Sequence, residues 1–147
     1  MPLLHDAQYK ATILRRVESL RPESRGQWGK MSVSQMLWHV NEALAGALVK
    51  VPEAPERVPL PRPLLKFLVL NLPWMRGAPT RKKWMPQQDM YDFTHERDRC
   101  LRLVDELTAK PLDADWSDSP TLGPMSGNDV SRLHAKHLNH HLTQFGV

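Results

Sequence analysis

Apolar residues recur every three or four positions along four stretches of the chain, which is the spacing of one buried face of an α-helix. Ile13 and Val17 share such a stripe in the first stretch, and Met36 and Val40 do so in the second. The alternation of apolar and polar residues that marks a strand does not extend over any useful length. The pattern predicts four long helices, over about residues 6–20, 32–49, 94–109 and 126–146.

Capping residues and prolines support the ends of these helices. Ser32 and Gln35 have the spacing of a capping box, in which each side chain bonds the other residue's backbone N–H. Asp92 or Thr94 is predicted to start the third helix, and the fourth is predicted to start near Ser126. A proline follows each of the first three helices because its ring cannot continue a helix: Pro22, Pro52 and Pro111.

A proline-rich connection of roughly forty residues separates the second and third long helices, with a short helix predicted at residues 63–71. Connections of that length are usually functional or cross from one side of a bundle to the other. At 147 residues the chain fits one domain with its own core. We therefore expect an all-α fold, a four-helix bundle with one long crossover connection between helices 2 and 3, as a single domain over residues 1–147.

Composition agrees with a soluble globular protein, since 41% of residues are apolar and 24% are charged. The single cysteine, Cys100, excludes an internal disulfide and a thiolate metal cluster, and its helical spacing with Val104 favours a core thiol over a nucleophile. The N-terminus lacks the features of a signal peptide, and the most apolar segment, residues 64–72, is too short to span a bilayer. We expect a cytoplasmic protein without a membrane span.

A basic cluster lies between two tryptophans in the long connection. Such a cluster can bind nucleic acid, an anionic membrane surface or an acidic small molecule, although a solvated loop is the commoner case. Nucleic acid is disfavoured because no known DNA- or RNA-binding signature accompanies it. The candidate contacts to an anionic substrate are Arg76, Arg81, Lys82 and Lys83, with Trp74 and Trp84 on either side.

Four of the seven histidines lie between positions 134 and 141. At 100° per residue, His134, His137 and His141 fall within about 60° of one another, on the apolar face of the last helix. The opposite face, which is expected to meet solvent, carries Arg132, Lys136, Asn139 and Thr143. Each buried imidazole needs hydrogen-bond partners for its ring nitrogens, because an unpaired buried ring costs about 1–3 kcal/mol of folding free energy. Separate partners for three such rings on one helix face are hard to provide. A metal ion satisfies them together, and residues four apart on a helix are close enough to bind one ion. His137 and His141 form such a pair.

His39, in the middle of the second helix, is the natural third ligand, although a lone histidine there would more often be a packed core residue. His134 is a possible fourth ligand, a proton shuttle or a packed residue, and His140 points about 100° away from His141. Gln144 could bond a ligand histidine or face a neighbouring helix, and we favour the second. The remaining candidates near the site are Glu42 and Gln35.

The segments HAKHLNHHLTQFG and WGKMSVSQMLWHV resemble the DinB/YfiT-like superfamily of metalloenzymes, over nearly the whole chain. The resemblance implies a four-helix bundle in which His39, His137 and His141 bind a divalent metal, often zinc or nickel. Characterised relatives include bacillithiol S-transferases and a mycothiol-dependent maleylpyruvate isomerase, and many relatives are dimers. Within the superfamily the chain resembles a bacterial subfamily without an assigned reaction.

Three functions fit these observations. The leading hypothesis is an enzyme whose metal activates a low-molecular-weight thiol for transfer or isomerisation, with the basic cluster holding the carboxylates of the thiol. The second is a hydrolase in which Glu42 acts as general base for a bound water. The third is a non-catalytic homodimer stabilised by the metal or by packed histidines. Trp28, Trp38 and Trp116 are expected to be packing anchors, whereas Trp74 and Trp84 fit packing and substrate binding about equally.

Overall fold

The structure is a computed structural model that describes residues 2–49 and 53–147. Over these residues its regular structure is helical, with five α-helices, one short 3-10 helix and no strand. An isolated antiparallel bridge pairs Ser119 with Gly123. The predicted all-α fold class is therefore confirmed. The elements are α1 (Ala7–Ser19), α2 (Val33–Leu48), α3 (Arg62–Asn71), η1 (Lys82–Trp84), α4 (Phe93–Ala109) and α5 (Gly127–Gln144).

The helix starts follow the predicted capping residues. The Ser32 and Gln35 side chains form a capping box at the start of α2, and Ser126 forms one with Asp129 at the start of α5. The carboxylate of Asp92, rather than the Thr94 hydroxyl, caps α4 by accepting a hydrogen bond from the backbone of His95. Pro52, which was predicted to stop the second helix, lies outside the described residues.

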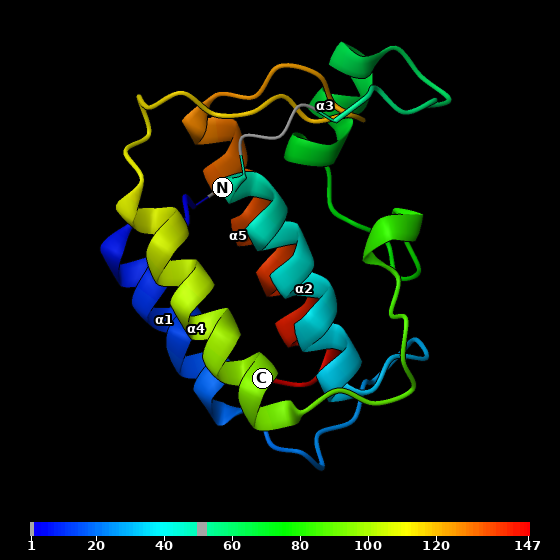
Figure 1. Cartoon of the computed structure of the whole chain (residues 1–147), viewed down its shortest axis with the longest axis vertical. Helices are drawn as coiled ribbons and strands as arrows, with labels where there is room; N and C mark the ends of the chain where they lie inside the picture. The colour runs from blue at the N-terminus through cyan, green and yellow to red at the C-terminus, as the bar shows by residue number, and fades with distance from the viewer. Residues whose placement is uncertain (1, 50–52) are drawn as a thin grey trace.

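The four longer helices lie side by side, with α1 next to α4 and α2 in front of α5 (Figure 1). The most extensive helix–helix contact joins α2 and α4. The space between the helices is filled by aliphatic side chains, which supply most of the free energy of folding because they leave water. The core includes the fully buried residues Ile13, Val17, Met36, Leu44, Val104, Leu107 and Leu138.

Cys100 lies within this core with none of its surface exposed. Burial raises the pKa of its thiol to about 12, because the low-dielectric core disfavours the thiolate. The expected core thiol is therefore confirmed.

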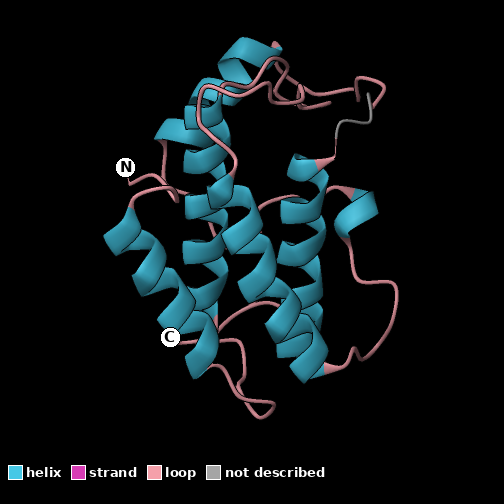
Figure 2. Ribbon diagram, turned by 60° about the vertical axis from the view of Figure 1, so that its left-hand side comes forward, coloured by secondary structure: helices cyan, strands magenta, loops and turns pink. Residues whose placement is uncertain are grey.

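The connection between α2 and α4 runs over the outside of the longer helices, as the turned view in Figure 2 shows. Within it, α3 packs against α5. The ammonium of Lys136 donates to the carbonyl oxygens of Val69 and Leu72, at 2.6 Å each. Lys136 was predicted to face solvent with the polar side of the last helix, and that prediction is wrong because the end of α3 covers it. Among the described residues, no helix is both long and apolar enough to cross a membrane.

The start of α5 is fixed by a close backbone approach. Gly127 lies directly against the carbonyl of Leu112, so a side chain at this position would collide with backbone. This contact aligns α5, and with it the histidines of that helix, against the connection that follows α4.

Candidate metal centre

Three imidazoles from two helices meet inside the helical assembly. His39 comes from α2, and His137 and His141 come from successive turns of α5, so the histidine pair predicted from helix geometry and the expected third ligand lie together. One ring nitrogen of each lies within 4.8 Å of the others. Their exposed fractions are 3%, 9% and 8%, which places them at the inner edge of the core.

The spacing of the three nitrogens is compatible with one shared metal ion. The Nε2 atoms of His39 and His137 are 2.9 Å apart. A tetrahedral ion with metal–nitrogen distances of about 2.0–2.1 Å needs ligand nitrogens about 3.3 Å apart. Because the observed separations, from 2.9 to 4.8 Å, bracket this value, small rotations of the rings accommodate one ion. The residues present therefore fit a divalent metal.

A backbone carbonyl sets the tautomer of His39. The Nδ1 atom of this ring lies 2.8 Å from the carbonyl oxygen of Trp84, in η1. A carbonyl oxygen only accepts hydrogen bonds, so Nδ1 carries the proton. In the neutral ring the lone pair is then on Nε2, the atom that faces His137, and His39 is prepared as an Nε2 ligand.

A second hydrogen-bond chain sets the tautomer of His141. The Gln144 amide nitrogen donates to the carbonyl oxygen of Trp28 at 2.8 Å, which leaves the amide oxygen facing His141 Nδ1, also at 2.8 Å. Because that oxygen only accepts, His141 Nδ1 carries the proton and Nε2 is free. The preferred prediction, that Gln144 faces a neighbouring helix, is wrong: Gln144 bonds His141, as a residue that supports a metal-binding histidine would.

The electrostatic environment keeps all three imidazoles neutral. Burial, together with repulsion from the nearby His39, lowers the pKa of His141 to about 3. The pKa of His137 is shifted well below its usual range, first by burial and then by repulsion from His141 and His39. Burial also lowers the pKa of His39, more than the Trp84 carbonyl raises it. Neutral imidazole is the form that binds metals, so the site is in its binding form at neutral pH.

The other predicted site residues take different places. His134 is buried one turn before His137, but it is outside the group of converging nitrogens, and its Nδ1 has no hydrogen-bond partner. The Glu42 carboxylate accepts from Arg99 of α4 at 2.9 Å. Gln35 remains at the start of α2, where it completes the capping box and donates to the backbone of Gln88.

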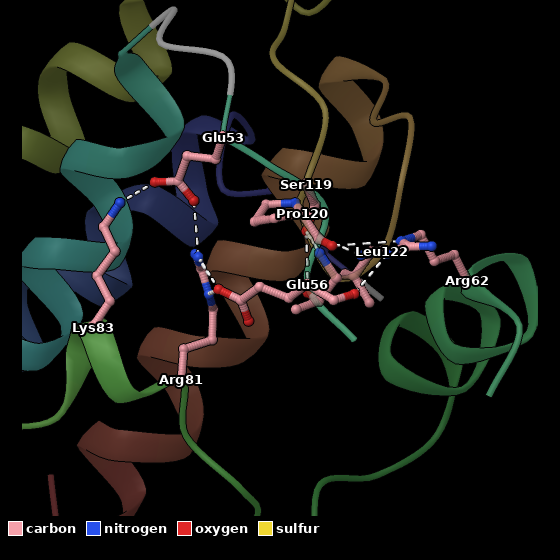
Figure 3. A network of polar contacts seen from close by, with 9 residues as sticks. Glu53, Glu56, Arg62, Arg81, Lys83, Ser119, Pro120 and Leu122 are labelled. Carbon is pink, nitrogen blue, oxygen red and sulfur yellow. Dashed lines mark hydrogen bonds and ion pairs between the residues drawn. The ribbon is translucent and has the colours of Figure 1, made fainter. Parts of the chain in front are cut away.

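Two members of the basic cluster are paired within the chain. The Arg81 guanidinium contacts the carboxylates of Glu53, at 2.8 Å, and Glu56, at 2.5 Å (Figure 3). Lys83 also pairs with Glu53. These ion pairs join the two ends of the long connection just beside Trp84, whose carbonyl binds His39, and we call them the connection clamp. Lys82 is exposed.

Two tryptophans contact histidines of α5, and one of them contacts a member of the triad. The Trp74 ring is 5.8 Å from the ring of His137 and 5.8 Å from that of His140. The Trp28 ring is also 5.8 Å from His140, and the Arg76 guanidinium lies over Trp28 at 4.4 Å. Trp28 was expected to be a packing anchor, and its ring packs against His140.

Comparison with known proteins gives a family but no characterised relative. A search of the curated proteins and a search of the solved structures each found no match. A family model described as "Protein of unknown function (DUF1569)" matches residues 4–146, which include all three histidines of the triad. The chain therefore belongs to the DUF1569 family.

Proposed function

We propose that this protein binds one divalent metal ion, zinc or nickel, through His39, His137 and His141, and that the ion activates a low-molecular-weight thiol for transfer or isomerisation. One observation carries the proposal. His39 and His141 are both held in the tautomer that leaves Nε2 unprotonated, by acceptors on their Nδ1 atoms, and both contribute to one cluster of converging nitrogens. Packed histidines need not turn unprotonated nitrogens toward a common point, whereas ligands to one ion must.

The number of ligands supports a reactive site. Three protein ligands leave at least one position on the ion for a substrate, as in catalytic rather than closed structural sites. When bound, the ion favours the thiolate form of a thiol, which is the nucleophilic form. Cys100 does not provide this thiol because it is fully buried in the core. The thiol is therefore a substrate or cosubstrate, and the role of the protein is to hold and orient it.

Metal-dependent hydrolysis is the weaker alternative, because it requires a general base near the ion. Glu42, the candidate from the sequence, is paired with Arg99. Within residues 2–49 and 53–147, the group of possible metal ligands that includes the triad contains no carboxylate. A thiol needs no base of this kind once the cation stabilises its anion.

Metal content tests the ligand assignment. The protein, His39→Ala, His141→Ala and the control His95→Ala are purified in parallel and their zinc and nickel measured by elemental analysis. His95 is exposed near the start of α4, so its removal should leave the metal content unchanged. We expect about one ion per chain in the parent and the control, and loss of the ion in the two triad variants. Full occupancy in both triad variants would exclude the proposed site.

Thiol binding tests the chemistry separately. Cobalt- or nickel-loaded protein is titrated with 2-mercaptoethanol and monitored for the charge-transfer absorption of a metal–thiolate bond. We expect the band to appear in the parent and to be absent from His141→Ala. Stable metal binding with no thiolate band, together with ester hydrolysis, would favour the hydrolase. Metal binding with neither property would favour a non-catalytic, metal-stabilised protein.

We also propose that the fold is a DinB/YfiT-like four-helix bundle, in which α1, α2, α4 and α5 are the bundle helices and α3 lies in the crossover, and that the protein is a cytoplasmic homodimer. The side-by-side packing of the four long helices and the long connection outside them support the bundle. Superposition of an experimental structure on known bundles of that superfamily tests the fold. Sedimentation velocity tests the homodimer, which a single sedimenting species with the mass of one chain would exclude.

A further inference from the structure

We propose that Arg76, stacked on Trp28 beside the histidine triad, binds the carboxylate of an anionic thiol whose sulfur reaches the metal. The inference rests on the proposed function and specifies its substrate class, a thiol that carries at least one carboxylate. It assigns the anion-binding role to one residue of the basic cluster and removes it from Arg81 and Lys83.

A series of ring contacts leads from Arg76 to the triad. His140 lies next to His141, with ring centres 5.1 Å apart, and is half-buried. Trp28 and Trp74 both contact the His140 ring, and Trp74 also contacts His137. We call Trp28, Trp74 and His140 the aromatic collar. Arg76 lies at its outer side, over the Trp28 ring, so it is separated from His141 by only two rings.

Arg76 differs from the other cations of the basic cluster in its partner. Arg81 is held by two carboxylates and Lys83 by one, so their charges are neutralised within the connection clamp. Arg76 is exposed, and no ion pair joins it to a carboxylate in the part of the chain that the structure describes. The Arg76 guanidinium instead lies over the indole ring of Trp28.

This arrangement leaves the N–H groups of the Arg76 guanidinium available, because among the described residues its side chain makes no hydrogen bond or ion pair. A carboxylate binds an arginine bidentately through two such N–H groups. The indole also restricts the arginine side chain, which lowers the entropy lost when an anion binds. A substrate with a thiol at one end and a carboxylate at the other could therefore contact both the ion and Arg76 across the collar.

Trp74 is held in place beside the proposed binding path of the substrate. Its indole N–H donates to the Val69 carbonyl at 2.8 Å, and the ammonium of Lys136 lies over its ring at 5.5 Å. These contacts fix Trp74 to the end of α3 and to α5, while Arg76, two residues later, remains exposed. The anchored indole gives the substrate a rigid wall, and the arginine beyond it gives a charged contact.

Two thiols that differ in charge test the proposal on metal-loaded protein. Mercaptosuccinate carries carboxylates and 2-mercaptoethanol does not, and the dissociation constant of each is measured from the metal–thiolate absorption band. The variants are Arg76→Gln and the matched control Arg57→Gln, which alters an exposed arginine in another part of the same connection. We expect Arg76→Gln to weaken mercaptosuccinate binding about tenfold, with metal content and 2-mercaptoethanol binding unchanged. Arg57→Gln should change none of the three.

The outcomes separate this inference from the proposed function. Equal mercaptosuccinate affinity in Arg76→Gln and the parent overturns the anion site and leaves the metal chemistry intact. If no thiolate band forms with either thiol, the proposed function fails, and succinate binding is then followed by tryptophan fluorescence. A succinate affinity that falls in Arg76→Gln but not in Arg57→Gln still supports the anion site, whereas an unchanged affinity excludes it.

Discussion

His39 Nδ1 and the carbonyl oxygen of Trp84 lie 2.8 Å apart although 45 positions separate the two residues in the sequence. The contact joins the middle of α2 to η1, at the far end of the long connection. The tautomer of one candidate ligand is therefore set by a segment outside the four longer helices. Any change that moves η1 away from α2 removes the acceptor that keeps His39 Nε2 free for a metal.

Arg81→Gln should weaken metal binding although Arg81 does not touch the triad. The substitution removes the ion pairs to Glu53 and Glu56 that hold η1 beside α2. Partly exposed ion pairs contribute only modestly to the free energy that holds a segment in place, so we expect zinc affinity to fall about two- to fivefold. Competition with a chromogenic chelator measures the change. Arg102→Gln, at an exposed position of α4, is the control, and equal affinities in both variants would contradict a role for the connection clamp.

Gln144→Ala should have a larger effect on metal affinity, because Gln144 bonds His141, a proposed ligand, directly. Its loss frees the His141 ring to rotate and to change tautomer, and it also releases the Trp28 carbonyl. Removing such a support typically lowers metal affinity about 10- to 100-fold. The same chelator competition applies, with Gln88→Ala as the matched control at an exposed position. An affinity for Gln144→Ala within a factor of two of the parent would show that His141 needs no such support.

The helices and the His137–His141 pair could be predicted because both depend on local spacing. Helical periodicity fixes which residues share a face, and capping residues act within a few positions of a helix end. The supports of the ligands could not be predicted in this way. Trp84 and Trp28 act through backbone carbonyls, which have the same chemistry at every residue, so no side-chain pattern marks them. Lys136 was misplaced because the polar side of α5 is covered by α3, and helix periodicity does not show what packs over a face.

Two glycine substitutions should change stability in opposite directions. Gly127→Ala drives a methyl group into the Leu112 backbone, and such overpacking costs about 1–3 kcal/mol of unfolding free energy. Gly46→Ala lies within α2, where the new methyl group would meet the Trp84 ring at an ordinary contact distance of 3.7 Å. We expect the second variant to be more stable by about 0.5–1 kcal/mol, because alanine favours the helix interior. Urea unfolding monitored by circular dichroism measures both, and a neutral Gly127→Ala would contradict the close approach at the start of α5.

Acid should destabilise the metal-free protein, partly through His134. Burial lowers the pKa of this imidazole from 6.5 to about 4. Between these values the unfolded chain binds a proton that the folded chain does not, so stability falls as the pH drops from 6.5 towards about 4. The full shift corresponds to on the order of 3 kcal/mol. Unfolding midpoints in urea are measured with a chelator present at pH 7, 5 and 4. The midpoint should fall less between pH 7 and pH 4 in His134→Leu than in the parent. Equal losses in the two proteins would show that His134 does not contribute.

The burial of Cys100 has a practical consequence for these experiments. It is the only cysteine in the sequence, and its thiol is fully buried with a pKa of about 12. Maleimides and similar reagents attack exposed thiolates, so the folded protein presents no native target to them. A cysteine introduced on the surface, for example at exposed Met75 in the loop of the aromatic collar, becomes a single attachment point for a dye or spin label. Movement of that loop when a thiol binds can then be observed in a protein that keeps its native core.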